Sequence, residues 1–246
     1  MGGWHDGYTN AALRMSQNLP NCRAIIGPWS HNWPDTVLPG PNIAFMDECL
    51  QFWEEHLKGV GGKWESMPRL RWYQCHGIVA PAPSVLSWPG HWQSGDGKEE
   101  GRVMFRFSDD GKLSPLQRSN PGLLASPVSV AFSGSAGLHC GEWLSFGAPD
   151  LANDQRSVAA YHGCWFTVPV SQPLHIMGHC EVSVICSVDT EAAQLYVGLC
   201  HVMSSSNGGY RLITYGVQNI NGRYLIGVKF GNIVNLISLF GCSTVC

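Results

Sequence analysis

The sequence is poor in charged residues and has no long apolar run. Only 13% of its 246 residues are Asp, Glu, Lys or Arg, and the formal net charge is −3. The cationic residues are scattered instead of forming the basic face that nucleic-acid binding requires. No 18 consecutive apolar residues occur, because Lys229, Asn232 and Asn235 interrupt the most apolar stretch, 224–240. We therefore expect neither nucleic acid nor a membrane as a partner.

The cysteines lack the density of a disulfide scaffold and include no Cys-x-x-Cys pair. Ten cysteines make up about 4% of the chain, whereas disulfide scaffolds usually exceed about 8%. Most lie inside apolar runs, where a buried free thiol is the usual state; examples are Cys49, Cys75, Cys186 and Cys200. This usage favours a reducing compartment such as the cytoplasm. Residues typical of a domain interior follow Met1 at once, so the N-terminus gives no targeting information.

The rest of the composition is that of a folded, turn-rich chain. Apolar residues make up 44% of the sequence, with 29 glycines, 15 prolines and 10 tryptophans. Such a composition favours β-structure over disorder or helical repeats. The length suffices for one large domain or two modest ones with a real core.

The first region, residues 1–62, has α/β character. Residues 24–27, "AIIG", predict a short buried strand, and a helix is expected before it in "YTNAALRMSQNL". A second helix is expected over 43–58, with Asn42 as its N-cap and Gly59 as its terminator. Its apolar residues recur at helical spacing and predict the face that packs on a sheet; they are Ile43, Met46, Leu50, Trp53 and Leu57. This order is typical of the last piece of a doubly wound α/β domain.

The second region, residues 63–246, loses helical periodicity. Short β-rich runs such as "RVMFRFS", "WFTVPV" and "YRLITYGVQNI" alternate with turn clusters such as Asp109-Asp110-Gly111. Many short strands with this punctuation predict an all-β sandwich or jelly roll.

An acid and a histidine stand where two neighbouring strands of the first region should end. Asp6 lies in "GGWHDGYTN", and His31 follows the strand in "RAIIGPWSHNWP". In α/β-hydrolases the acid and the histidine follow the nucleophile in that order. The carboxylate orients the imidazole, which takes the proton of the nucleophile. We therefore expect a carboxylate oxygen of Asp6 within about 2.6–3.2 Å of a ring nitrogen of His31.

Two alternatives stand beside this assignment. An Asp or a His on a loop is more often solvated or bonded locally than catalytic. His5 also competes with His31 for the histidine role, although in an extended segment its side chain would point away from that of Asp6.

Several motifs together resemble one enzyme family. "GGWHDGYTNAALRM" and "AIIGPWSHNWPDTVLPGPNIAFMDECLQFWEEHLKG" are similar to the acid and histidine segments of the CocE/NonD hydrolases, which include cocaine-esterase-like acyl esterases and X-Pro dipeptidyl-peptidases of the S15 type. "SWPGHW" and "GLHCGEWLSFGAPDLANDQRS" are similar to the C-terminal jelly roll of that family, and the resemblance spans residues 2–219.

The resemblance implies a fold and roles for three residues. Residues 1–62 would be the C-terminal edge of an α/β-hydrolase domain, and residues 63–246 a jelly-roll β-sandwich. Asp6 would be the triad acid and His31 the general base, while Trp29 would help to wall the acyl pocket. The substrate would be a small-molecule ester or a peptide, and neither a cofactor nor a metal is implied. The sequence carries no signal for the oligomeric state.

The sequence departs from the family in what it lacks. The family's Gly-x-Ser-Tyr-x-Gly elbow is absent, and the nearest stretch, 133–137, begins with a serine where the first glycine should stand. The helical cap and the oxyanion tyrosine are also expected upstream. We therefore expect the C-terminal part of a longer enzyme, inactive by itself. The atypical tail, 220–246, lacks the family's closing turn, and residues after Asn219 should pack poorly and leave edge strands exposed.

Two further interpretations remain. The chain could instead be a non-catalytic binding or scaffolding module, a jelly roll with a vestigial hydrolase edge. His175, His179 and Cys180 have a spacing that metal ligands can use, but no second pair lies nearby in the sequence. We expect these three residues to be structural.

Overall fold

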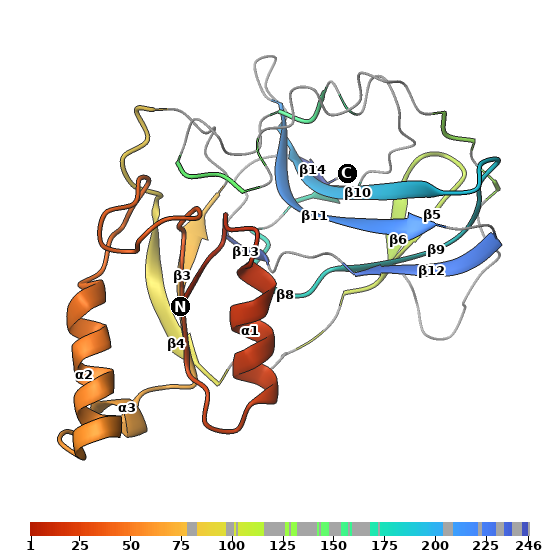
Figure 1. Ribbon diagram of the computed structural model, residues 1–246. Helices are drawn as coiled ribbons and strands as arrows, with labels where there is room; N and C mark the ends of the chain where they lie inside the picture. The colour runs from red at the N-terminus through yellow and green to blue at the C-terminus, as the bar shows by residue number, and fades with distance from the viewer. Residues whose placement is uncertain are drawn as a thin grey trace. The chain divides into compact units, whose positions relative to one another are not determined.

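The computed structural model is mostly β-sheet with few helices (Figure 1). It describes residues 1–77, 83–96, 101, 103–115, 126–127, 129–131, 142, 144–147, 154–156, 158, 168–171, 173–203 and 209–220, and the backbone of 223–229, 234–237 and 243–245. The chain divides into two compact units. Unit 1 comprises residues 1–98 and 142–151, and unit 2 comprises 99–141 and 152–246.

Unit 1 is built on a sheet whose first strands run parallel. β1 (Gly2–Gly3) pairs with β2 (Ala24–Gly27), which pairs with β3 (Leu70–His76); β4 (Gly90–Gly95) then pairs antiparallel with β3. Parallel neighbours require a crossover, which is usually helical. α1 (Thr9–Asn18) connects β1 to β2, and α2 (Phe45–Lys58) and α3 (Lys63–Ser66) connect β2 to β3.

The core of unit 1 centres on β2. All four residues of this strand are buried, as the apolar sequence predicts. Ile25 clusters with Trp29, Val37 and Trp64, and Phe52 of α2 packs against this cluster. From α1, Leu13 is 1% exposed. The cluster thus fixes β2 and the residues that follow it, where the histidine loop begins.

The orientation of α2 corrects the sequence-based prediction. Four of the five residues of the apolar stripe that was expected to pack on the sheet are exposed, at 68% for Met46, 56% for Leu50, 53% for Trp53 and 74% for Leu57. The fifth, Ile43, precedes the helix and packs against the core cluster as expected. The helix instead turns toward the sheet the side that bears Phe52 and Glu48. Phe52 meets the ring of Trp64 edge-on at 5.5 Å, and Glu48 accepts a 2.7 Å hydrogen bond from Arg71 of β3. Periodicity finds an apolar stripe but cannot tell whether the chain covers it.

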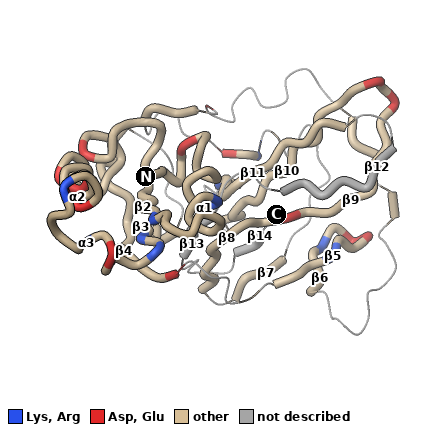
Figure 2. The backbone as a smooth tube through the Cα atoms, turned by 60° about the horizontal axis from the view of Figure 1, so that its bottom comes forward, with Lys and Arg blue, Asp and Glu red and all other residues tan. Residues whose placement is uncertain are grey.

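The capping prediction for α2 is correct at its C-terminal end and wrong at its N-terminal end. Gly59 terminates the helix in the left-handed conformation, at φ 67°, as predicted. Asn42 is not the N-cap, because the helix begins at Phe45 and the Asn42 amide donates to the carbonyl of Val37 at 3.0 Å. Acidic residues stand in the first turn and Lys58 in the last, an order that suits the helix dipole. Figure 2 shows both signs of charge along this helix.

Unit 2 consists of antiparallel strand pairs throughout its described part. β5 (Phe105–Phe107) pairs with β6 (Leu113–Pro115), and the long β10 (Ala193–Val202) pairs with β11 (Tyr210–Ile220). The other strands are β7 (Val168–Val170), β8 (Ile176–Gly178), β9 (Glu181–Ser187), β12 (Arg223–Lys229), β13 (Val234–Ile237) and β14 (Ser243–Val245). β9 pairs with β12, and β8 pairs with β13.

The tail pairs more fully than expected. β14 lies between β10 and β7 in a four-stranded sheet, so this tail strand is not an edge. The β-branched and aromatic residues of the tail can join a ladder even though the family's turn is missing. The predicted poor packing concerns side chains outside the described residues and stays a prediction.

The fold also bears on where the chain divides into domains. The residues on both sides of the boundary predicted at 62/63 belong to unit 1, where β3 pairs in parallel with β2. The predicted division into domains stays a prediction. No helix in the described part of the chain is long and apolar enough to cross a membrane.

The exposed stripe on α2 leads to a first prediction. Leu50→Ala and Leu57→Ala should each change the free energy of unfolding by less than about 0.5 kcal/mol, because these side chains touch water. Leu70→Ala should lower it by about 2–5 kcal/mol, since Leu70 is 0% exposed. Urea denaturation followed by tryptophan fluorescence measures the difference. A loss above about 2 kcal/mol at Leu50 would mean that the stripe is buried.

Candidate functional site

The acid loop begins directly at the end of β1. The Trp4 N–H donates to the carbonyl of Gly27 at 2.8 Å, and the Trp4 indole N–H donates to the carbonyl of Tyr73 at 2.8 Å. The hydroxyl of Thr9, which is fully buried, bonds to the carbonyls of Gly3 and Asp6. The loop is therefore tied to both β2 and β3 before it reaches Asp6.

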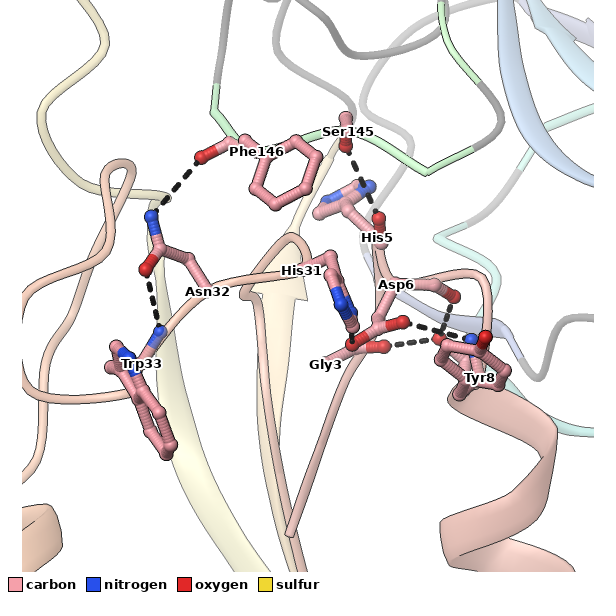
Figure 3. A network of polar contacts seen from close by, with 10 residues as sticks. Gly3, His5, Asp6, Tyr8, His31, Asn32, Trp33, Ser145 and Phe146 are labelled. Atoms are coloured by element: carbon pink, nitrogen blue, oxygen red, sulfur yellow. Dashed lines mark hydrogen bonds and ion pairs between the residues drawn. The ribbon is translucent and has the colours of Figure 1, made fainter.

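Asp6 uses its two carboxylate oxygens for two different partners (Figure 3). Oδ1 accepts the backbone N–H of Tyr8 at 2.8 Å, and Oδ2 lies 3.1 Å from Nδ1 of His31. The side chain of Asp6 is 17% exposed and that of His31 is 38% exposed. A carboxylate at Nδ1 favours the tautomer with a proton on that nitrogen, which leaves Nε2 as a base. The distance agrees with the sequence-based expectation.

The histidine loop follows β2 through a tightly packed tryptophan. A Cβ at Gly27 would lie 2.3 Å from the ring of Trp29, so only glycine fits there. The Trp29 indole donates to the carbonyl of Pro41 at 2.8 Å, and its side chain is 1% exposed. Trp29 thus lies in the core and does not line the cavity described below. Its predicted role in walling an acyl pocket stays a prediction.

Three residues that the sequence analysis missed surround His31. The carbonyl of Ser145 accepts the backbone N–H of His31 at 2.8 Å. The rings of Tyr8 and Phe146 lie 5.7 Å and 5.5 Å from the imidazole, the latter edge-on. Tyr8 is only two residues from Asp6, so its place beside the pair is predictable from the sequence. Ser145 and Phe146 carry no local signal, because more than a hundred residues separate them from the loop they touch.

His5, the competitor, has a different environment. Its ring stacks on Trp88 with centroids 4.9 Å apart, and Figure 3 shows it turned away from the Asp6 carboxylate. Burial lowers the pKa of His5 to about 4. The structure therefore brings His31, and not His5, to Asp6.

A cavity of about 730 Å³ adjoins the pair. Asp6 and His31 line it together with six aromatic side chains, which are Trp33, Phe45, Phe52, Trp53, Trp64 and Phe146. Glu48, which is 12% exposed, also lines the cavity and already has Arg71 at 2.7 Å and Lys63 at 3.6 Å. An aromatic cavity beside an oriented histidine suits an apolar small molecule.

The other candidate sites add nothing to this region. The stretch 133–137, nearest in sequence to a serine elbow, lies outside the described residues. Within the described ranges, no three His, Cys, Asp or Glu side chains gather as metal ligands would. His175 is exposed, and Cys180 is only partly exposed.

Comparison with known proteins identifies the family. The family described as "X-Pro dipeptidyl-peptidase C-terminal non-catalytic domain" matches residues 63–225, and the chain belongs to it. This agrees with the resemblance to CocE/NonD hydrolases found in the motifs. No curated protein matches the chain.

Two solved structures share the fold at low sequence identity. An aminopeptidase from a marine sediment archaeon, a Thaumarchaeota archaeon, is 13% identical with a TM-score of 0.62, and the match covers 100% of this chain and 45% of that one. A CocE/NonD family hydrolase from Staphylococcus aureus is 8% identical with a TM-score of 0.61, and the match covers 99% and 44%. The chain therefore spans less than half the length of either protein.

The burial of His5 gives a second prediction. Its pKa is about 4 in the folded chain against 6.5 normally, so protons bind the unfolded state more readily. The stability due to neutral His5 is complete above about pH 6.5 and is lost as the pH falls toward 4. His5→Phe should remove that part of the pH dependence. Urea unfolding of both proteins between pH 7 and 4 tests this; parallel pH profiles would contradict it.

Proposed function

We propose that this chain supplies the acid and the general base of a serine hydrolase that cleaves an ester or amide acyl bond. The observation that carries the proposal is the 3.1 Å contact between Asp6 Oδ2 and His31 Nδ1. Asp6 holds the imidazole in one tautomer, and His31 exchanges protons through Nε2. The cavity beside the pair supplies an apolar surface for the substrate.

The proposal includes a fold for each of the two regions of the chain. In it, residues 1–62 are the C-terminal edge of an α/β-hydrolase domain, and residues 63–246 are a jelly-roll β-sandwich. In support, Asp6 follows β1, His31 follows β2, and a helix separates these two parallel strands. That is the chain order of acid and histidine in α/β-hydrolases.

The chemistry requires a serine that the sequence does not offer in an elbow. In the longer enzyme, a serine outside this chain attacks the acyl carbon while His31 takes its proton. His31 then protonates the departing alcohol or amine. Water attacks the acyl-enzyme, passes its proton to His31, and the serine regains a proton from His31. The substrate class is a small-molecule ester or a peptide, so both acyl esterase and X-Pro dipeptidyl-peptidase activity fit.

One observation favours a second candidate, a non-catalytic binding or scaffolding module. The matched family is described as non-catalytic. However, that match begins at residue 63, whereas Asp6 and His31 lie before it. A purely structural module would have no need of a carboxylate held against a histidine in this geometry.

The third prediction separates the two candidates. A longer form that carries a Gly-x-Ser-x-Gly elbow before residue 1 should hydrolyse p-nitrophenyl esters or X-Pro anilides and react with a fluorophosphonate at that serine. Asp6→Asn in this form should lower kcat by up to about 10⁴-fold through the wrong tautomer. Asp47→Asn, at an exposed position of α2, is the matched control and should leave kcat unchanged.

The 246-residue chain by itself should neither hydrolyse these substrates nor react with the fluorophosphonate. Labelling of this chain would reveal a nucleophile within it. A longer form with an intact elbow but no activity would favour the binding module.

A further inference from the structure

One short segment of the chain belongs to unit 1 although it lies between two parts of unit 2 in the sequence. Residues 142–151 are part of unit 1, although the chain on both sides of them belongs to unit 2. The structure describes residues 144–147 of this segment. Within it Ser145 is 1% exposed, while Phe146 is 60% exposed. The serine, and not the aromatic residue, is the buried member.

Ser145 contacts both loops of the candidate site. Its carbonyl accepts the backbone N–H of His31 at 2.8 Å. Its hydroxyl donates to the carbonyl of His5 at 3.3 Å, as Figure 3 shows. The side-chain amide of Asn32 lies 3.5 Å from the carbonyl of Phe146. One buried residue therefore connects the loop that carries Asp6 to the loop that carries His31.

The second connection between these loops lies on the strand side. There the His5 N–H donates to the carbonyl of Trp29 at 3.0 Å, which continues the pairing of β1 with β2. Beyond this point Asp6 and His31 are held together only by their own side-chain contact and by Ser145, among the hydrogen bonds of the described residues. At 3.1 Å that contact is near the long end of a productive hydrogen bond.

We propose that Ser145 is a positioning residue, which sets the separation of the acid loop from the histidine loop. Its catalytic consequence rests on the proposed function. Ser145 lies inside the range 63–225, whose family is described as non-catalytic, so that part of the chain takes part in the site through a backbone carbonyl and a hydroxyl. A shift of about 1 Å between catalytic groups can reduce a rate about 10²-fold.

Hydrogen exchange in the 246-residue chain tests the connection without any activity. Ser145→Ala removes the bond to His5 and should raise the exchange rates of the His31 amide and of its Nδ1 proton by roughly 2- to 10-fold. Ser145→Cys keeps the size with a weak donor and should behave like the alanine variant. Ser108→Ala is the matched control, because it removes a serine hydroxyl bonded to Ser114 in unit 2. Core amides of β2 should exchange as in the unchanged chain.

Unchanged exchange at His31 in Ser145→Ala would overturn the proposal, and so would faster exchange throughout β2, which indicates general destabilisation. Wild-type behaviour in Ser145→Cys would also overturn it, since size alone would then suffice.

Kinetics of the longer form test the catalytic consequence. Ser145→Ala should lower kcat by up to about 10²-fold and leave KM unchanged. Faster exchange with an unchanged kcat would overturn the positioning role. If the longer form is inactive without any substitution, the proposed function fails, while faster exchange at His31 still supports the connection between the loops.

Discussion

The packing of Trp29 against two glycines is the constraint on which the candidate site depends. A Cβ at Gly3 would lie 2.2 Å from the carbonyl of Trp29, and one at Gly27 would lie 2.3 Å from its ring. Because both positions are glycine, the backbone of the acid loop can lie close to Trp29, which stands two residues before His31. The pairing of Gly3 with Gly27 then places the ends of β1 and β2 side by side. Asp6 and His31 meet as a consequence of that backbone contact.

The sequence predicts the parts of this arrangement that follow from local pattern. β2 is a run of apolar residues, α1 is expected as a helix from its sequence, and α2 has helical spacing and a glycine terminator, so the existence and approximate bounds of these elements can be predicted. The meeting of Asp6 with His31 is also predictable, because neighbouring parallel strands end at the same edge. The buried face of α2 is not, since its exposed stripe is as periodic as a packed one. Ser145 cannot be found either, because its contact with His31 depends on the course of more than a hundred intervening residues.

The chain combines a catalytic-type geometry with a region whose family is described as non-catalytic. The matched range, 63–225, excludes Asp6 and His31 but includes β3, which pairs with β2, and Ser145. The family boundary and the contacts of the folded chain therefore do not coincide. The chain also spans less than half of the solved hydrolase and aminopeptidase it resembles. We expect this arrangement, an acid beside a histidine with no serine elbow in the sequence, if the chain supplies only part of the active site of a longer enzyme.

The tautomer of His31 in the 246-residue chain tests the central claim most directly. Nitrogen NMR of the imidazole, recorded where the ring is neutral, distinguishes a proton on Nδ1 from a proton on Nε2. We expect the Nδ1–H tautomer in the unchanged chain and a loss of that preference in Asp6→Asn, with the rest of the spectrum preserved. A proton on Nε2, or a tautomer ratio that Asp6→Asn does not alter, would contradict the assignment of Asp6 and His31 as an acid–base pair.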